Sequence, residues 1–208
     1  MGKVTDIDGN SYKNNTKEGV KNYIEGLNQL VVKKNNPEGI ATLIKAVDQL
    51  GKHKFAWVAC HNLGIIFLAT HEYDKAIKYL NKISSLPEPN PEDLVDFTEG
   101  EQHSNDIQNV YLLLCDAYFG KVNELLDKHE FDQAIHICKK VISFDYKDMM
   151  GPAYYNLGQC VTKKAIQLLR KDRDSVNAIK LLDESVKYME KSSALGFELA
   201  IKALKRNK

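Results

Sequence analysis

The sequence predicts an all-α protein in which antiparallel helix pairs stack into a solenoid, with a capping helix at the C-terminal end. Apolar residues recur at every third or fourth position through most of the chain, which is the period of an amphipathic helix. A segment that begins at His71 also returns at His129, with five of seven residues identical (HEYDKAI against HEFDQAI). Self-similarity of this kind is typical of a repeat protein, whose units bury their apolar faces against one another.

Composition places the chain among ordinary globular proteins. Of 208 residues, 43% are hydrophobic and 27% are charged, and the formal net charge of +1 gives no global field that favours nucleic acid or an anionic membrane. No apolar run reaches the length of a membrane span, and no apolar core of a secretion signal follows Met1. We therefore expect a cytoplasmic protein without a membrane segment. The four cysteines lie among apolar residues and form no Cys-x-x-Cys pair, which favours buried, reduced thiols.

The first third of the chain predicts a polar arm and one helix pair. Residues 1–15 are polar and turn-rich, so we expect a flexible arm there. The pair spans about 16–50, with Thr16 as a plausible N-cap. Asn36 and Pro37 separate its two helices, because proline is well tolerated at the first position of a helix. Gly51 then ends the second helix.

The second pair is expected at 55–86 and is the clearest of the four. Its two apolar helices meet at the turn around His71, and the run of prolines from Pro87 to Pro91 ends the pattern. The residues at 87–105 are acidic and irregular. They predict a solvated insertion between the helix pairs.

Two further pairs and a final helix complete the prediction. The third pair spans 107–144 and contains the repeated HEFDQAI turn, while the fourth spans 152–194. Gly196 ends the last of these helices. An amphipathic segment at 197–205 suits a terminal capping helix, which needs one solvated face.

The chain resembles the tetratricopeptide repeats at a defined set of places. The best-matched unit carries Leu63, Gly64, Phe67, Tyr73, Ala76, Leu80 and Pro87 at or next to the family's consensus positions. The resemblance implies a right-handed solenoid in which the first helix of each pair lines a concave groove. In the two later units the glycine place and the following alanine are 19 and 20 positions apart, against 12 in the best unit. Either their first helices or their connecting turns are therefore longer by about two helical turns.

Asn62 and Asn156 are the first candidates for binding residues. Each precedes a Leu-Gly step, and the resemblance implies that this place faces the groove. An asparagine amide both donates and accepts hydrogen bonds, so it can hold an extended peptide backbone; the alternative is a local hydrogen bond or one to water. His61, Ile65 and Tyr155 are neighbours expected at the same surface. The basic residues with which some members of the family grip a terminal carboxylate are not found at the matching places.

The remaining motifs point away from catalysis. No phosphate-binding loop, nucleophile elbow or His-x-x-x-His pair occurs, so we predict no enzymatic activity, no cofactor and no metal. The leading hypothesis is a protein-interaction module that binds a peptide or helix in its groove. The alternatives are a scaffold that self-associates through its convex faces or terminal helix, and an RNA-binding repeat protein with a basic C-terminal helix. Basic pairs such as Lys163-Lys164 and Arg170-Lys171 lie among acidic residues, which indicates solvated helix faces.

Overall fold

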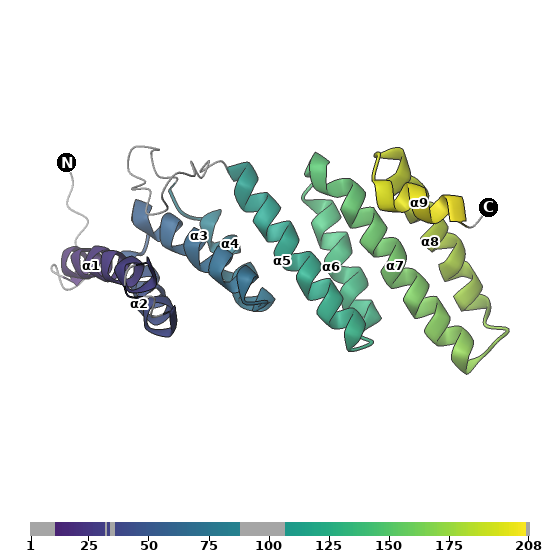
Figure 1. Ribbon diagram of the computed structural model, residues 1–208, viewed down its shortest axis with the longest axis horizontal. Coiled ribbons are helices and arrows are strands. Elements are labelled where there is room, and N and C mark those ends of the chain that lie inside the picture. Colours follow the sequence, from purple (N-terminus) through teal and green to yellow (C-terminus); the bar gives the residue numbers. More distant parts are fainter. Residues whose placement is uncertain (1–10, 32, 34–35, 88–106, 207–208) are drawn as a thin grey trace. The chain divides into compact units, whose positions relative to one another are not determined.

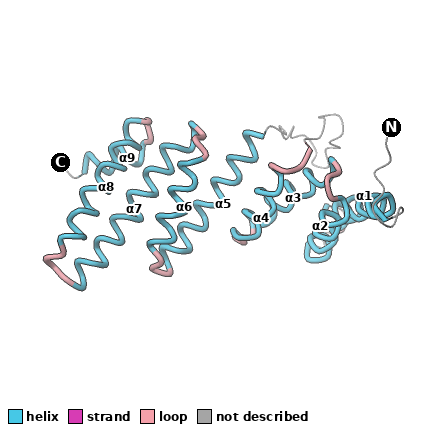
Figure 2. The backbone as a smooth tube through the Cα atoms, turned by 180° about the vertical axis from the view of Figure 1, so that it is seen from behind, coloured by secondary structure: helices cyan, strands magenta, loops and turns pink. Residues whose placement is uncertain are grey.

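A computed structural model describes residues 11–31, 33, 36–87 and 107–206 (Figures 1 and 2). Every regular element among these residues is an α-helix, which confirms the predicted all-α class. The chain divides into two compact units, Met1–Leu113 and Leu114–Lys208. Residues 1–10 and almost all of the acidic segment predicted at 87–105 lie outside the described residues.

The first unit contains two helix pairs. They are formed by α1 (Ser11–Val31) with α2 (Asn36–Leu50) and by α3 (Lys54–Ala69) with α4 (Tyr73–Ile83), and α2 also packs against α3. Residues 11–15 belong to α1, so the expectation of a flexible arm through residue 15 is wrong for these five residues. The helix α4 ends at Ile83, three residues before the predicted end.

Close packing within these pairs depends on glycines. A methyl group added at Gly64 of α3 would lie 2.5 Å from the buried side chain of Leu80 on α4. The α1–α2 pair lacks the consensus residues but uses the same device, because a methyl group at Gly39 would lie 2.6 Å from Leu30. In both pairs the missing side chain lets a leucine of the partner helix approach the backbone.

The second unit contains the longest described helix, α7 (Lys147–Lys171), with 25 residues. From Leu114 onward α5 (Ile107–Asp127) belongs to this unit, followed by four further helices: α6 (Phe131–Ser143), α7, α8 (Val176–Ala194) and α9 (Glu198–Arg206). Neighbours in sequence pack side by side, and α9 packs against α8 (Figure 1). The helix α7 begins five residues before the predicted boundary at Pro152. It begins there because Asp145 leaves the preceding helix with a positive φ of 52° and Tyr146 is extended.

The repeated HEYDKAI and HEFDQAI segments adopt the same backbone. His71 and His129 have φ angles of 59° and 60°, in the left-handed region that histidine adopts more readily than most residues. The residue after each histidine donates its backbone N–H to a carbonyl five residues earlier, at 2.8 Å in both cases (Glu72 to Phe67 and Glu130 to Leu125). The two segments are therefore alike in backbone structure as well as in sequence.

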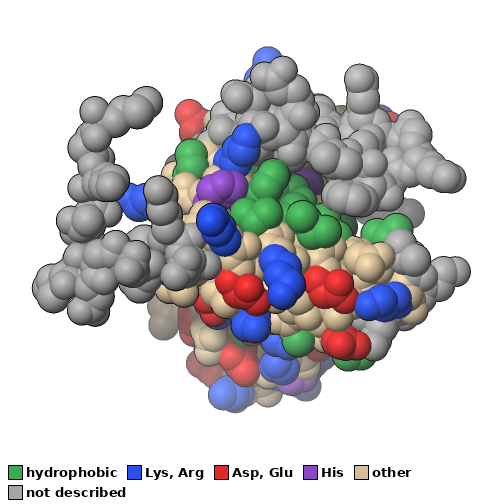
Figure 3. Space-filling model, turned by 90° about the vertical axis from the view of Figure 1, so that its left-hand side faces the viewer, with side chains coloured by type: hydrophobic (Ala, Val, Ile, Leu, Met, Phe, Trp, Pro, Cys, Tyr) green, Lys and Arg blue, Asp and Glu red, His purple; other side chains and the backbone are tan. Residues whose placement is uncertain are grey.

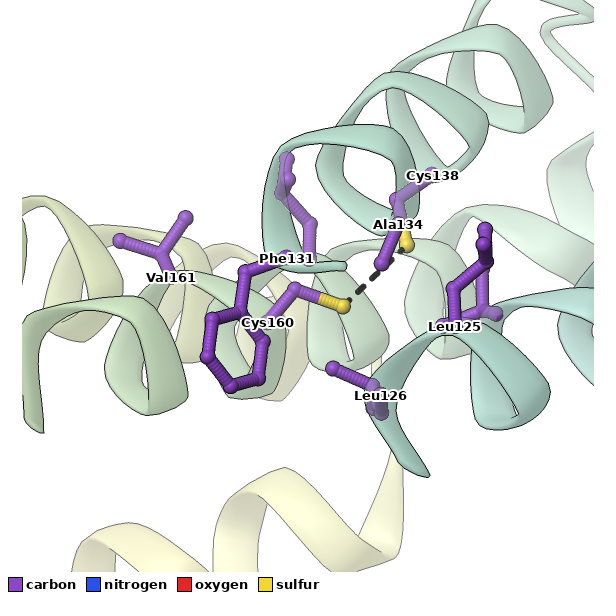
Figure 4. Close-up of a cluster of buried hydrophobic side chains, with 9 residues drawn as sticks. Leu125, Leu126, Phe131, Ala134, Cys138, Cys160 and Val161 are labelled. Atoms are coloured by element: carbon purple, nitrogen blue, oxygen red, sulfur yellow. Dashed lines mark hydrogen bonds between the residues drawn. The ribbon is translucent and has the colours of Figure 1, made fainter. Parts of the chain in front are cut away.

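Buried thiols form part of the core of the second unit. The Sγ atoms of Cys138 on α6 and Cys160 on α7 lie 3.9 Å apart among Leu125, Phe131 and other apolar side chains (Figure 4). All four cysteines are free and buried, as predicted. The hydrogen bond to Cys160, together with burial, raises the pKa of the Cys138 thiol.

Candidate functional site

The helix α3 brings two of the predicted site residues to one face. Asn62 and Ile65 are three positions apart on this helix, so their side chains project from neighbouring places. Both side chains are half-buried at the surface. Between them, Leu63 and Gly64 point into the core and contact α4, which fixes the direction of the Asn62 side chain.

His61 does not belong to this surface. Its side chain is only 4% exposed, and its ring stacks on Trp57 at 5.3 Å between centroids. Because Trp57 is itself buried, the histidine is a core residue of the first unit, and the expectation that it faces a groove is wrong.

The helix α7 carries the other two predicted residues. Asn156 is half-buried at the surface, in the same place relative to Leu157 and Gly158 that Asn62 has relative to Leu63 and Gly64. Tyr155 is also half-buried, but its ring contacts Phe197 at the start of α9, with centroids 5.3 Å apart. Tyr155 therefore helps to seat the capping helix. Asn62 and Asn156 lie in separate units.

The two asparagine amides have no polar partner among the described residues. Among the described residues, neither the Asn62 nor the Asn156 side chain makes a hydrogen bond or any other polar contact. The local hydrogen bond left open by the sequence is therefore absent in this part of the chain. A half-buried amide without an internal partner presents both a donor and an acceptor to whatever covers it.

Asn156 is the first residue of a polar face that runs along α7. Residues seven apart lie almost on one line of a helix, and Asn156, Lys163 and Arg170 have this spacing. Gln159 and Gln167 project from the same side, and all five side chains are half-buried or exposed. This line of amide and cationic side chains, from Asn156 to Arg170, is called the α7 face below.

A pocket of about 490 Å³ lies at the C-terminal end of the α7 face. Its apolar part is formed by Leu126 of α5, Phe131 of α6 and Ile166 of α7. Leu126 and Phe131 belong to the buried core of the unit, whereas Ile166 is 42% exposed (Figure 4). Lys163, Gln167 and Arg170 line the polar side, and His129 lies at the turn between α5 and α6.

The adjacent lysines of the Lys163-Lys164 pair have different roles. The Lys164 ammonium forms an ion pair with Asp132 on α6. Lys163 projects into the pocket and forms no ion pair with any described residue, and the same is true of Arg170. None of the described residues that line the pocket is acidic. The pocket is therefore a cationic site with an apolar floor.

The sequence analysis singles out Asn156 but not the other residues of the α7 face. The spacing of seven from Asn156 to Lys163 and Arg170 is present in the sequence and was the available signal. This spacing is easy to overlook because each cation has a second one beside it in the sequence. The pairs Lys163-Lys164 and Arg170-Lys171 therefore resemble ordinary solvated helix faces.

Other kinds of site find no support in the described residues. In that part of the chain, no three His, Cys, Asp or Glu side chains gather as metal ligands do. None of its helices combines the length and apolar character that crossing a membrane requires. Comparison of the chain with models of protein families, with curated proteins and with solved structures finds no match.

Proposed function

We propose that this chain is a non-enzymatic protein-interaction module that binds a peptide or helix of another protein along the first helices of its pairs. The observation that carries the proposal is the pair of unused amides, Asn62 on α3 and Asn156 on α7. They occupy equivalent places in two units, although the fold of neither unit requires their hydrogen bonds. An amide in this state gains a full hydrogen bond when a peptide backbone covers it.

The proposal includes a repeat of the tetratricopeptide type with a right-handed twist. It is supported by the equal turns at His71 and His129, and by the use of glycine and leucine where α3 meets α4. A crystal structure that gave a left-handed arrangement of the helix pairs would contradict this part of the proposal.

Capture of a partner from a lysate of the source cells tests the binding function. The variants Asn62→Ala and Asn156→Ala are expected to capture less of the same partner than the unchanged chain, because each loses a bidentate contact to the bound backbone. Asn177→Ala on α8 is a matched control, since its side chain is exposed and lies on a second helix. Undiminished capture by both variants, with helical content intact, would rule out the groove assignment.

Self-association is the second candidate, and exposed apolar side chains favour it. On α8, Val176, Ile179 and Val186 are 62%, 52% and 47% exposed. On α1, Ile24 is 54% exposed, and hydrophobic side chains gather among charged ones on the side of the molecule where α1 and α2 lie (Figure 3). Light scattering over a concentration series distinguishes the candidates, because a strict monomer excludes self-association.

A further inference from the structure

The pocket at the end of α7 exists because the first helices of the second unit are long. Five residues follow Gly64 within α3, whereas thirteen follow Gly158 within α7. The lining residues Ile166, Gln167 and Arg170 lie in this additional length, and Lys163 directly precedes it. The pocket is therefore a property of the second unit and not of the repeat itself.

The charges around the pocket favour a negatively charged ligand. Lys163 and Arg170 present two cations that no described acidic side chain neutralises, while Lys164 beside them is already paired with Asp132. Carboxylates bind an arginine guanidinium in a planar, bidentate manner and a lysine ammonium as a point charge. A segment that carries two or more carboxylates fits this arrangement.

The floor of the pocket adds a second requirement. Ile166 exposes a large apolar side chain to the pocket, beside Leu126 and Phe131, which also line it but are only 8% and 7% exposed. A ligand that places a leucine, isoleucine or phenylalanine side chain here removes this surface from water. Nucleic acid meets the cations but leaves the apolar floor uncovered, so the lining favours a peptide.

The length of the α7 face sets the size of the bound segment. From Asn156 to Arg170 the helix rises roughly 21 Å at 1.5 Å per residue. This length matches about six residues of an extended peptide. The amides of Asn156, Gln159 and Gln167 lie along the whole face and suit a peptide backbone, whereas the two cations lie at its middle and at its C-terminal end.

We propose that the second unit binds an extended acidic peptide of another protein, with one apolar side chain held in the pocket and its flanking carboxylates on Lys163 and Arg170. This inference rests on the proposed function and specifies the ligand for one half of the chain. The peptide backbone lies along the α7 face, where Asn156 holds it. The affinity falls steeply with salt because two exposed cations contribute to it.

A random peptide library displayed on phage tests the proposal with the full chain as bait. Peptides enriched by the unchanged chain are expected to place Asp or Glu next to Leu, Ile or Phe. The double variant Lys163→Glu, Arg170→Glu is expected to lose this acidic signature, with affinity for a representative enriched peptide lowered about tenfold or more. Ile166→Ala is expected to relax the apolar preference and keep the acidic one.

The matched control is Lys139→Glu, Lys180→Glu, which makes the same change of net charge at exposed positions on α6 and α8. It is expected to enrich the same peptides as the unchanged chain. Peptides without an acidic signature, or a signature that survives the Lys163 and Arg170 reversal, overturn this inference but leave the proposed function standing. Failure to enrich any peptide also overturns this inference, and the lysate capture described above then decides the proposed function on its own. The site is assigned to RNA instead if no acidic peptides are enriched and the chain retains single-stranded RNA in a salt-sensitive manner. In that case Lys163→Glu, Arg170→Glu abolishes the retention and the control variant does not.

Discussion

The α3–α4 pair of the first unit and the α7–α8 pair of the second share one motif but differ in length. Both first helices carry Asn-Leu-Gly, with the leucine buried and the asparagine at the surface. Yet α3 has 16 residues and α7 has 25. The difference teaches that the part of the helix around the glycine determines the packing of a pair, whereas the turns added beyond it are available for binding chemistry.

The glycines themselves show how far the two pairs are equivalent. A methyl group at Gly64 would lie 2.5 Å from Leu80, a fully buried branched side chain. A methyl group at Gly158 would lie 3.0 Å from the terminal methyl group of Met189, which is flexible, and 3.2 Å from the Ser185 carbonyl oxygen. The second pair is therefore less tightly constrained than the first at the same place.

The largest expected effect tests whether the shared motif has the same role in both units. Leu63 and Leu157 are 0% and 1% exposed, so Leu63→Ala and Leu157→Ala are each expected to cost about 2–5 kcal/mol of stability. Urea unfolding followed by circular dichroism measures the effect, and the fluorescence of Trp57 reports the first unit. Leu195→Ala, at a side chain that is 51% exposed, is the control and should change stability by less than about 0.5 kcal/mol. A large loss at only one leucine would break the equivalence.

Alkaline pH is expected to weaken both units in the same way. Burial raises the pKa of Cys60 in the first unit and of Cys115 in the second to about 11, from an ordinary value of 9.0. The unfolded chain loses these protons near pH 9 while the folded chain keeps them. Stability is therefore full below pH 9 and falls between pH 9 and 11, by up to about 3 kcal/mol per thiol.

Urea unfolding on either side of pH 9 measures this loss. Cys60→Ala and Cys115→Ala are each expected to flatten the pH dependence of the unfolding free energy. A slope unchanged in both variants would show that the thiols ionise equally easily in the folded and unfolded chains.

The glycine contrast gives an intermediate effect. Gly64→Ala is expected to destabilise the chain by about 1–3 kcal/mol, because Leu80 has no room to move. Gly158→Ala is expected to cost less than Gly64→Ala, about 1 kcal/mol or below, since Met189 yields and the gain of up to about 1 kcal/mol in helix propensity offsets the crowding against the Ser185 carbonyl oxygen. Thermal unfolding of both variants measures the difference, and equal losses would show that the two pairs are equally tight.

The smallest effect concerns the repeated turns. His71 Nδ1 and Tyr73 Oη lie 2.9 Å apart in an exposed hydrogen bond, whereas His129 faces Phe131, which has no hydroxyl. Tyr73→Phe is expected to lower stability by about 0.5 kcal/mol. This variant gives the turn of the first unit the same His and Phe side chains as the turn at His129 and Phe131. A loss above about 1 kcal/mol in urea unfolding would show that the Tyr73 hydroxyl has a larger role in the first unit.

The pairing of helices could be predicted from sequence because its signals are local. The HEYDKAI repeat, the Leu-Gly step and the apolar period each act within a few turns of one chain segment. The helical state of residues 11–15 and the early start of α7 differ from the prediction, since residues 11–15 are polar and Pro152 resembles a helix start.

The candidate site was harder to predict because it depends on neighbours from other helices. Lys163 and Lys164 are adjacent and alike in sequence, yet only Lys164 meets Asp132, which lies on α6. Tyr155 is covered by Phe197, the residue that precedes α9. His61, by contrast, stacks on Trp57 within the same helix. No pattern within α7 alone contains the contacts of Lys164 and Tyr155.

The order of the helix contacts has a consequence for how the chain folds. Among the described elements, most helices pack on the helix that precedes or follows them in the sequence. Such a chain has a low contact order, so little loop-closure entropy opposes the formation of its contacts, and folding is expected to be fast. During synthesis, α1 and α2 can pair while α7 is still being made. Within each unit, a later helix then finds its docking surface already formed by the one before it.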